Sequence, residues 1–218
     1  MHAITLKSLK ARFLFPADEA TFSHLLLLVH GRTGNLRLLE WYSKRFQIPG
    51  LAFISLQAPF EDRREDQKDE GYSWYLDGKK GIEESRKLLI DVVTEIESQG
   101  ISAEKIFWLG FSQGAAMGLD LALRGPFKMG GFLCISGFCV QAQDYPQAFG
   151  PYAKAQRLFI SHGSRDEIVK LDFAEKTYQV LKQEKVSFEF QIFDKPHSFH
   201  LKEEVPMLEE RLKAWMTP

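Results

Sequence analysis

The chain has 218 residues, of which 44% are hydrophobic and 26% are charged, as is typical of an ordinary globular domain with a sizeable core. Lysine and arginine together number 28, aspartate and glutamate number 29, and the formal net charge is −1. This balance excludes a protein that attracts nucleic acid or an anionic membrane through its overall charge.

The cysteine content and the apolar runs of the sequence predict the cellular compartment. Cys134 and Cys139 are the only cysteines, and their spacing predicts neither a disulfide framework nor a zinc site, which favours a reducing compartment. Residues 1–10 lack the apolar core and cleavage site of a signal peptide. The longest apolar run, residues 25–29, is too short to span a bilayer. We therefore expect a cytoplasmic protein without stable membrane insertion.

Taken in chain order, the predicted elements alternate between strands and helices. One or two edge strands are expected within residues 4–15, and further strands at 25–29, 51–56, 105–109, 131–136, 157–161 and 186–193. Helices are expected at 36–46, 82–96, 115–123, 171–182 and 200–216. This alternation predicts one α/β domain over residues 1–218, with a mostly parallel sheet and helices on both faces.

The pentapeptide Gly110-Phe111-Ser112-Gln113-Gly114 is the strongest chemical signal. It lies between a predicted buried strand and a predicted helix, the context of a sharp turn that presents a nucleophilic serine. The alternative is a serine that caps the helix between two packing glycines.

A nucleophilic serine needs a general base, and histidine has a suitable pKa. The chain has six histidines, and we expect His30 and His162 to shape the turns that follow their strands. His197 lies in the loop after the last predicted strand, where a base belongs in the chain order Ser, Asp, His. His200 follows at the start of the last helix, so we favour His197 as the base and expect His200 to cap or pack there.

The carboxylate that orients the base is expected to be Asp166, just beyond the predicted strand at 157–161. Its other possible role is to cap the next helix. The backbone N–H groups of Gln113 and Arg32 are the expected oxyanion hole, with Gly31 allowing the chain to turn inward. No His-Glu-x-x-His or Cys-x-x-Cys spacing occurs, so we expect no metal requirement.

Residues 58–78 form the least regular region. Residues 61–70 comprise nine charged residues and one glutamine, which indicates a solvated loop. The aromatic cluster Tyr72, Trp74 and Tyr75 follows, and we expect Trp74 to bound an open, mainly apolar substrate groove. The alternative is that these rings only pin the loop to the core.

Four motifs together resemble the phospholipase/carboxylesterase family of α/β-hydrolases. They are Leu28-Val29-His30-Gly31-x-x-Gly34, Gly110-Phe111-Ser112-Gln113-Gly114-Ala115, His162-Gly163-Ser164-x-Asp166-x-x-Val169 and Pro196-His197-Ser198. Residues 72–75 are similar to a family segment whose tryptophan lies near the acyl pocket. Three features depart from the pattern: Pro196 replaces the usual glycine before the histidine, Arg32 stands where many relatives have an apolar residue, and residues 61–70 are unusually charged.

The resemblance implies a hydrolase of carboxylic esters or thioesters, with little or no lid and no cofactor. Its partner would be a small acyl ester or thioester, and the protein would be a monomer or homodimer that binds no nucleic acid. The alternative is a catalytically silent α/β-hydrolase fold that serves as a binding protein. A dienelactone-hydrolase-like enzyme is disfavoured because Ser112 stands where such an enzyme usually has cysteine.

Overall fold

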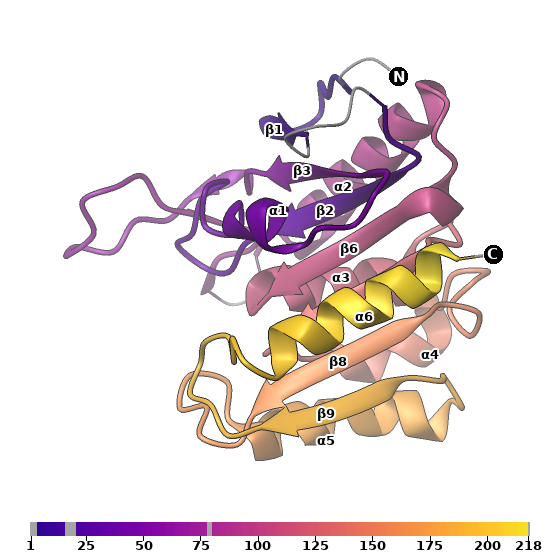
Figure 1. Cartoon of the computed structure of the whole chain (residues 1–218). Coiled ribbons are helices and arrows are strands. Elements are labelled where there is room, and N and C mark those ends of the chain that lie inside the picture. The colour runs from indigo at the N-terminus through magenta and orange to yellow at the C-terminus, as the bar shows by residue number, and fades with distance from the viewer. Residues whose placement is uncertain (1–3, 16–20, 78–79, 218) are drawn as a thin grey trace.

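A seven-stranded sheet forms the centre of the protein in the computed structural model, which describes residues 4–15, 21–77 and 80–217 (Figure 1). Its spatial order is β1-β3-β2-β6-β7-β8-β9, and only the pairing of β1 with β3 is antiparallel. The strands are β1 (Ala11–Leu14), β2 (His24–Val29), β3 (Leu51–Leu56), β6 (Ile106–Phe111), β7 (Gly131–Ile135), β8 (Leu158–Gly163) and β9 (Glu189–Phe193). The mostly parallel sheet predicted from the sequence is confirmed.

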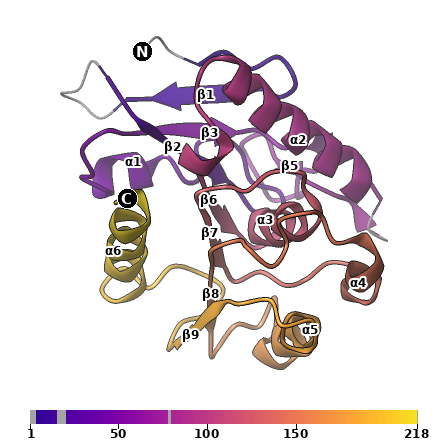
Figure 2. The ribbon, with the colours of Figure 1, turned by 90° about the vertical axis from the view of Figure 1, so that its right-hand side faces the viewer.

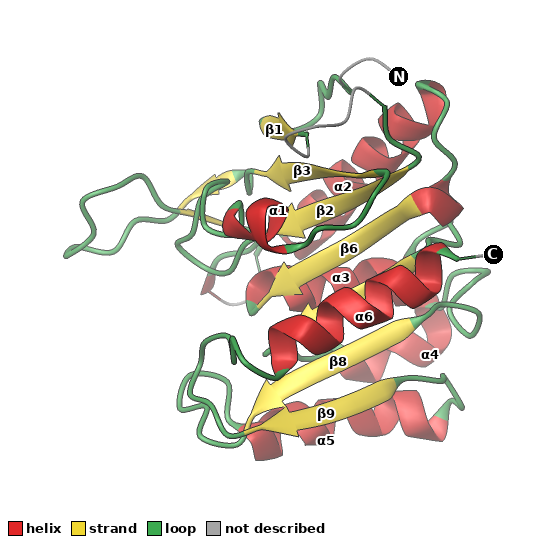
Figure 3. Cartoon of the chain, viewed as in Figure 1, coloured by secondary structure: helices red, strands yellow, loops and turns green. Residues whose placement is uncertain are grey.

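Helices cover both faces of this sheet (Figures 2 and 3). One face carries α1 (Trp41–Arg45) and α6 (Glu204–Met216). The other carries α2 (Ile82–Ser98), α3 (Gln113–Arg124), α4 (Tyr145–Ala148) and α5 (Leu171–Gln183). Short 3₁₀ helices span Ala103–Lys105 and Ala142–Asp144. Among the described residues, no helix combines the length and apolarity that crossing a membrane requires.

The apolar runs become the central strands because both of their faces are covered. All residues of β3 and β6 are buried except Phe111, and in β2 only His24 is partly exposed. Parallel strands flanked by helices on two sides have no solvent face, so their sequences do not alternate. The amphipathic helix α2 buries Ile82, Leu89, Val92, Val93 and Ile96 against the sheet.

Three predicted segments differ in detail. The helix predicted at 36–46 reduces to α1, because the N–H groups of Leu36 and Arg37 bind the side chains of Gln57 and Asn35 in a turn. The last helix begins at Glu204 rather than at residue 200, and Pro206 lies in its first turn, where proline is tolerated. Residues 58–75 contain an unpredicted two-stranded hairpin of β4 (Phe60–Glu61) and β5 (Tyr72–Ser73).

The strand order reverses direction at β2. This strand pairs with β3 on one side and with β6 on the other, and α1 and α2 lie on opposite faces. Ligands of open α/β sheets bind where the strand order reverses, at the carboxyl ends of the strands. The loops after β2 and β6 meet at this point, and the loops after β8 and β9 end on the same edge of the sheet (Figure 1).

Candidate active site

Ser112 lies at the sharp turn between β6 and α3. Its backbone has φ 54° and ψ −116°, a conformation that a residue with a Cβ seldom adopts and that is costly unless the surroundings impose it. The Ser112 N–H donates to the carbonyl of Ile135 (2.9 Å), and the Ser112 carbonyl accepts from Ala116 (2.9 Å). A strained serine held from both sides fits the predicted nucleophile turn better than an ordinary helix cap.

Both glycines of the pentapeptide are required by close backbone contacts. A Cβ on Gly110 would overlap the carbonyl oxygen of Gly114. A Cβ on Gly114 would overlap the carbonyl oxygen of Val29 at the end of β2. The two missing side chains therefore let α3 start directly against β6 and β2.

Asp166 lies in the turn after β8 with its carboxylate fully buried. The Oδ1 atom accepts hydrogen bonds from the backbone N–H groups of Ile168 (3.0 Å) and Val169 (2.8 Å). The Oδ2 atom lies 2.7 Å from Nδ1 of His197, in the loop after β9. Asp166 is thus the partner of His197, and it caps the turn at 166–169 rather than the next helix, α5, which begins at Leu171 with Lys170 as its N-cap.

The pairing defines the tautomer of His197. An ionised carboxylate only accepts, so Nδ1 of His197 carries the proton and donates it to Asp166. The lone pair then lies on Nε2, the nitrogen that a general base uses. The His197 ring is stacked obliquely beside Phe111 (ring centres 4.8 Å apart), and its side chain is 15% exposed.

Two other histidines shape turns, as expected from the sequence. Nδ1 of His30 lies 2.7 Å from the carbonyl oxygen of Gly31, and its Nε2 accepts from the N–H of Ala58 (3.1 Å). Burial lowers the pKa of His30 to about 4, so this ring is neutral. Nε2 of His162 donates to the carbonyl of Val169 (2.7 Å) and lies 3.5 Å from Oδ2 of Asp166.

His200 lies at the start of the last helix and is not among the described residues that line the groove at Ser112. Its N–H donates to Glu204 Oε2 (2.9 Å), its Nδ1 accepts from the N–H of Glu203 (3.2 Å), and its ring stacks on Phe193. This is the capping and packing role expected for His200.

A buried ion pair braces the loop that carries His197. Lys195 Nζ lies 2.5 Å from Oε1 of Glu204, and both side chains are at most 2% exposed. Burial lowers the pKa of Lys195, and the charge of Glu204 opposes this shift. The Lys195 carbonyl accepts from the N–H of Arg165 (3.1 Å), so the loops that hold Asp166 and His197 are joined next to their contact.

The residues expected to form the oxyanion hole lie around Ser112. Gly31 is so close that an added Cβ would lie 3.2 Å from Cβ of Ser112. Gln113 is the first residue of α3, and the first N–H groups of a helix have no acceptor within it. The side chain of Gln113 is engaged elsewhere, since it accepts from the N–H of Trp74 (3.0 Å) and donates to the carbonyl of Tyr75 (2.9 Å). Gln113 directly follows the serine, and Arg32, next to Gly31, lines the same groove as Ser112.

Trp74 does not occupy the position expected for it. The side chain is fully buried in the core, and its indole N–H donates to the carbonyl of His30 (2.8 Å). It is absent from the described lining of the groove at Ser112. The expectation that Trp74 bounds this groove is corrected, and the alternative applies: the ring anchors its loop behind the turn at His30.

A groove of about 430 Å³ opens over Ser112 and His197. Leu38, Phe111 and Ile168 supply apolar side chains to its lining. The remaining lining residues are Gly31, Arg32, Thr33, Asp62, Arg63 and Arg64. The charged loop was predicted only to be solvated, and its contribution to this groove was missed because an irregular segment has no periodicity from which to infer orientation.

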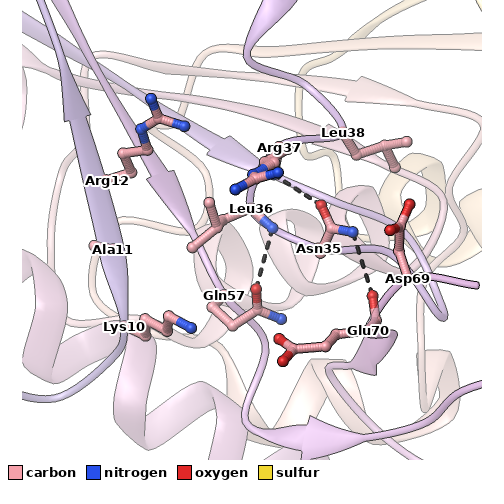
Figure 4. Close-up of a pocket in the computed structure, with 10 residues that line it drawn as sticks. All are labelled: Lys10, Ala11, Arg12, Asn35, Leu36, Arg37, Leu38, Gln57, Asp69 and Glu70. Atoms are coloured by element: carbon pink, nitrogen blue, oxygen red, sulfur yellow. Dashed lines mark hydrogen bonds between the residues drawn. The ribbon is translucent and has the colours of Figure 1, made fainter.

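A larger hollow of about 830 Å³ lies apart from these groups, between β1 and the segment 35–38 (Figure 4). Its lining residues are Lys10, Ala11, Arg12, Asn35, Leu36, Arg37, Leu38, Gln57, Asp69 and Glu70. Asn35 donates to the Glu70 carbonyl (3.2 Å) and accepts from the N–H of Arg37, so several polar groups there already have partners. The lining contains no histidine, serine or cysteine, whereas Ser112 and His197 line the smaller groove. No cluster of three or more metal-ligating side chains occurs in the part of the chain that the structure describes.

The sheet, the strained serine turn and the paired aspartate and histidine are those of an α/β-hydrolase. The chain belongs to the phospholipase/carboxylesterase family, whose family model matches residues 16–216.

Individual proteins are similar to this chain in sequence or in fold. Acyl-protein thioesterase 1 of Kluyveromyces lactis is 36% identical over 95 residues, which cover 43% of this chain and 42% of that protein. Acyl-protein thioesterase 1 of Mycosarcoma maydis is 24% identical over 220 residues, covering 91% of this chain and 90% of that protein. The crystal structure of Arabidopsis thaliana SOBER1 superposes with a TM-score of 0.77 at 22% identity, covering 89% of this chain and 99% of that one. The chain spans less than half the length of the first curated relatives that it matches.

Proposed function

We propose that the protein is a serine hydrolase that cleaves carboxylic esters or thioesters through an acyl-enzyme intermediate. The observation that carries the proposal is the hydrogen bond between His197 Nδ1 and Asp166 Oδ2, formed in the groove that Ser112 also lines. The family membership and the names of its acyl-protein thioesterase relatives support the same reaction class.

In the proposed first step, Nε2 of His197 takes the proton of the Ser112 hydroxyl while Oγ attacks the acyl carbon. Asp166 stabilises the imidazolium that forms, since its buried carboxylate lies 2.7 Å from Nδ1. The backbone N–H groups of Arg32 and Gln113 stabilise the negative charge on the former carbonyl oxygen.

The attack gives a tetrahedral intermediate bonded to Ser112. When this intermediate collapses, the alcohol or thiol leaves with the proton from His197, and the acyl group remains as an ester on Ser112. Water then attacks the acyl carbon while Nε2 of His197 accepts its proton. His197 returns this proton to Oγ of Ser112 as the ester bond breaks, which releases the carboxylic acid and restores the enzyme. All groups that these steps need come from the chain itself, and no cofactor enters the proposal.

Active-site labelling tests the proposal against a silent binding protein. A fluorophosphonate probe should label the wild type on Ser112 and should not label Ser112→Ala. Hydrolysis of p-nitrophenyl esters and acyl thioesters should fall by several orders of magnitude in Ser112→Ala, because the three groups act as a unit. Labelling of a residue other than Ser112, or a folded Ser112→Ala that keeps more than about a tenth of the activity, would contradict the assignment.

The cysteines support a cytoplasmic site of action within this proposal. Cys134 and Cys139 are both free and buried, and burial raises the pKa of each thiol. Buried, protonated thiols are inert packing groups, and free cysteines are more typical of reducing compartments.

A further inference from the structure

The groove over Ser112 has two unlike sets of side chains. Leu38, Phe111 and Ile168 are apolar, and Ile168 is 75% exposed, which suits contact with an acyl chain. The other set is strongly charged: Arg32, Arg63, Arg64 and Asp62. A groove for a wholly apolar substrate has no need of three guanidinium groups.

Two of these four charges already neutralise each other. Asp62 Oδ2 accepts from Nε of Arg32 (3.0 Å) and from the hydroxyl of Ser73 (2.7 Å). Nη1 of Arg32 lies 3.0 Å from Oδ1 of Asp77. Arg32 and Asp62 therefore form a fixed pair that holds the start of the charged loop to the turn beside Ser112.

Arg63 and Arg64 are not neutralised in this way. Nε of Arg63 donates to the carbonyl of Gln67 (2.7 Å), and the ion pairs of the described residues include none with Arg63. Glu61 and Glu70 line a separate hollow that Arg63 also borders. Arg64 has only a loose contact with Asp66 at 3.8 Å, in which both side chains are more than half exposed. Such an exposed pair contributes little, so the Nη donors of both arginines remain available to a ligand.

We propose that the groove selects acyl esters or thioesters that carry an anionic oxygen group, a carboxylate or a phosphate, and that Arg63 and Arg64 bind this group. The inference rests on the proposed function, since it places the acyl carbon at Ser112. Guanidinium groups bind carboxylate and phosphate through paired N–H donors, a geometry that lysine cannot supply. The anionic group lies on the acyl chain or on the leaving group of the substrate. In either position it is bound by the same two arginines.

Three matched pairs of thioesters test the proposal. The first pair compares S-butyryl-N-acetylcysteine, whose leaving group carries a carboxylate, with the S-butyryl thioester of the neutral N-acetylcysteine amide. S-butyryl-phosphopantetheine against S-butyryl-pantetheine tests a phosphate there. An adipoyl against an adipamoyl thioester of N-acetylcysteine amide tests a carboxylate on the acyl chain. The readout is the ratio of kcat/KM for the anionic member to that for the neutral member.

For at least one pair we expect a ratio of about ten in the wild type, because the anion would accept charge-assisted hydrogen bonds from two guanidinium groups at once. In Arg63→Gln/Arg64→Gln the ratio for that pair should fall to near one. The matched control is Lys68→Gln, which removes a cation from the same loop outside the groove lining and should keep the ratio. Raising the ionic strength from about 0.01 M to about 1 M shortens the Debye length from about 30 Å to about 3 Å, so the ratio should also fall with salt.

The outcomes separate this inference from the proposed function. Equal hydrolysis of both members in all three pairs would overturn the anion preference and leave the serine hydrolase standing. A preference that survives in Arg63→Gln/Arg64→Gln would also overturn it, because the arginines would not be its source. Absence of hydrolysis of all six thioesters together with absence of Ser112 labelling would overturn both. Comparing ratios removes any loss that the double substitution causes for both members alike.

Discussion

Asp166 and His197 are 31 positions apart in the chain, yet Oδ2 of Asp166 lies 2.7 Å from Nδ1 of His197. The two residues come from loops that follow the neighbouring parallel strands β8 and β9. Parallel pairing brings both loops to one edge of the sheet, and two backbone N–H groups fix the other carboxylate oxygen. The imidazole is thereby oriented before any substrate binds, a preorganisation that enzymes use to lower the barrier of proton transfer.

The first prediction separates the two neighbouring histidines. His197→Gln should lower kcat/KM by roughly four orders of magnitude, because the base and its imidazolium are lost. His200→Gln is the matched control, since His200 caps and packs the start of α6, and its kcat/KM should stay within about twofold of the wild type. Rate measurements on one ester and one thioester check both variants. An active His197→Gln variant, or a strongly impaired but folded His200→Gln variant, would refute the assigned base.

The second prediction concerns Trp74 and the specificity for acyl chains. Trp74→Ala should reduce the free energy of unfolding by about 3–5 kcal/mol, as is usual for a fully buried tryptophan. The milder Trp74→Phe loses the hydrogen bond to His30 at a cost of about 1 kcal/mol, and should leave the dependence of kcat/KM on chain length unchanged.

Ile168→Ala is the comparison variant, because Ile168 is exposed and lines the groove. Each methylene that contacts an apolar surface contributes up to about 0.8 kcal/mol, so this variant should flatten the rise of kcat/KM from acetyl to octanoyl esters. If the dependence of kcat/KM on acyl-chain length changes in Trp74→Phe and not in Ile168→Ala, Trp74 contacts the acyl chain and this prediction is wrong.

Sequence reasoning succeeded where one local rule dominates. The short apolar runs at 25–29 and 51–56 favour buried strands, and the spacing of Gly110, Ser112 and Gly114 between a strand and a helix favours a particular turn. The choice of Asp166 and His197 used chain order and position after strands, and the structure brings these two residues into contact.

Sequence reasoning failed where long-range packing decides. Nothing local distinguishes a tryptophan that faces a groove from one that donates to the carbonyl of His30, because residues 74–77 have no periodic pattern. The same holds for Arg63 and Arg64, whose direction depends on how the hairpin β4–β5 and the pair Arg32–Asp62 hold the charged loop. Lys195 and Glu204 are nine residues apart, and only the fold makes them a buried ion pair.

The third prediction tests that ion pair. Lys195→Met leaves the Glu204 carboxylate buried without a counter-charge, and should cost about 3–5 kcal/mol of the free energy of unfolding. Lys195→Met/Glu204→Met removes both charges and should recover much of this loss. Urea unfolding of the wild type and both variants measures the effect. A single variant within about 1 kcal/mol of the wild type would show that the pair is unimportant for stability. If the single variant does not fold, a double variant that folds still supports the prediction, and one that also fails contradicts it.

The fourth prediction is the pH dependence of stability that His30 introduces. Burial lowers the pKa of this ring from 6.5 to about 4 in the folded protein, while the unfolded chain retains the ordinary value. Between these two pH values the unfolded state binds more protons than the folded state, so the free energy of unfolding rises with pH. The stability that His30 contributes is lost as the pH falls through this window. Across the whole window, protonation of this one residue in the unfolded state lowers the free energy of unfolding by about 3 kcal/mol. His162, whose pKa is also lowered by burial, adds a contribution of the same sign.

The structural cause is specific, because a proton on Nε2 of His30 would face the N–H of Ala58, which now donates to that nitrogen at 3.1 Å. Urea unfolding at pH values between 4 and 8 gives the slope of the unfolding free energy against pH, which measures the protons taken up on unfolding. This slope should be smaller in His30→Gln than in the wild type, by the equivalent of up to one proton. The comparison holds even if the variant is less stable at every pH. His24→Gln is the control, since the His24 ring is only partly buried and its removal should change the slope less. A His30→Gln slope identical to that of the wild type would contradict a lowered His30 pKa and would assign the pH dependence of stability to other groups.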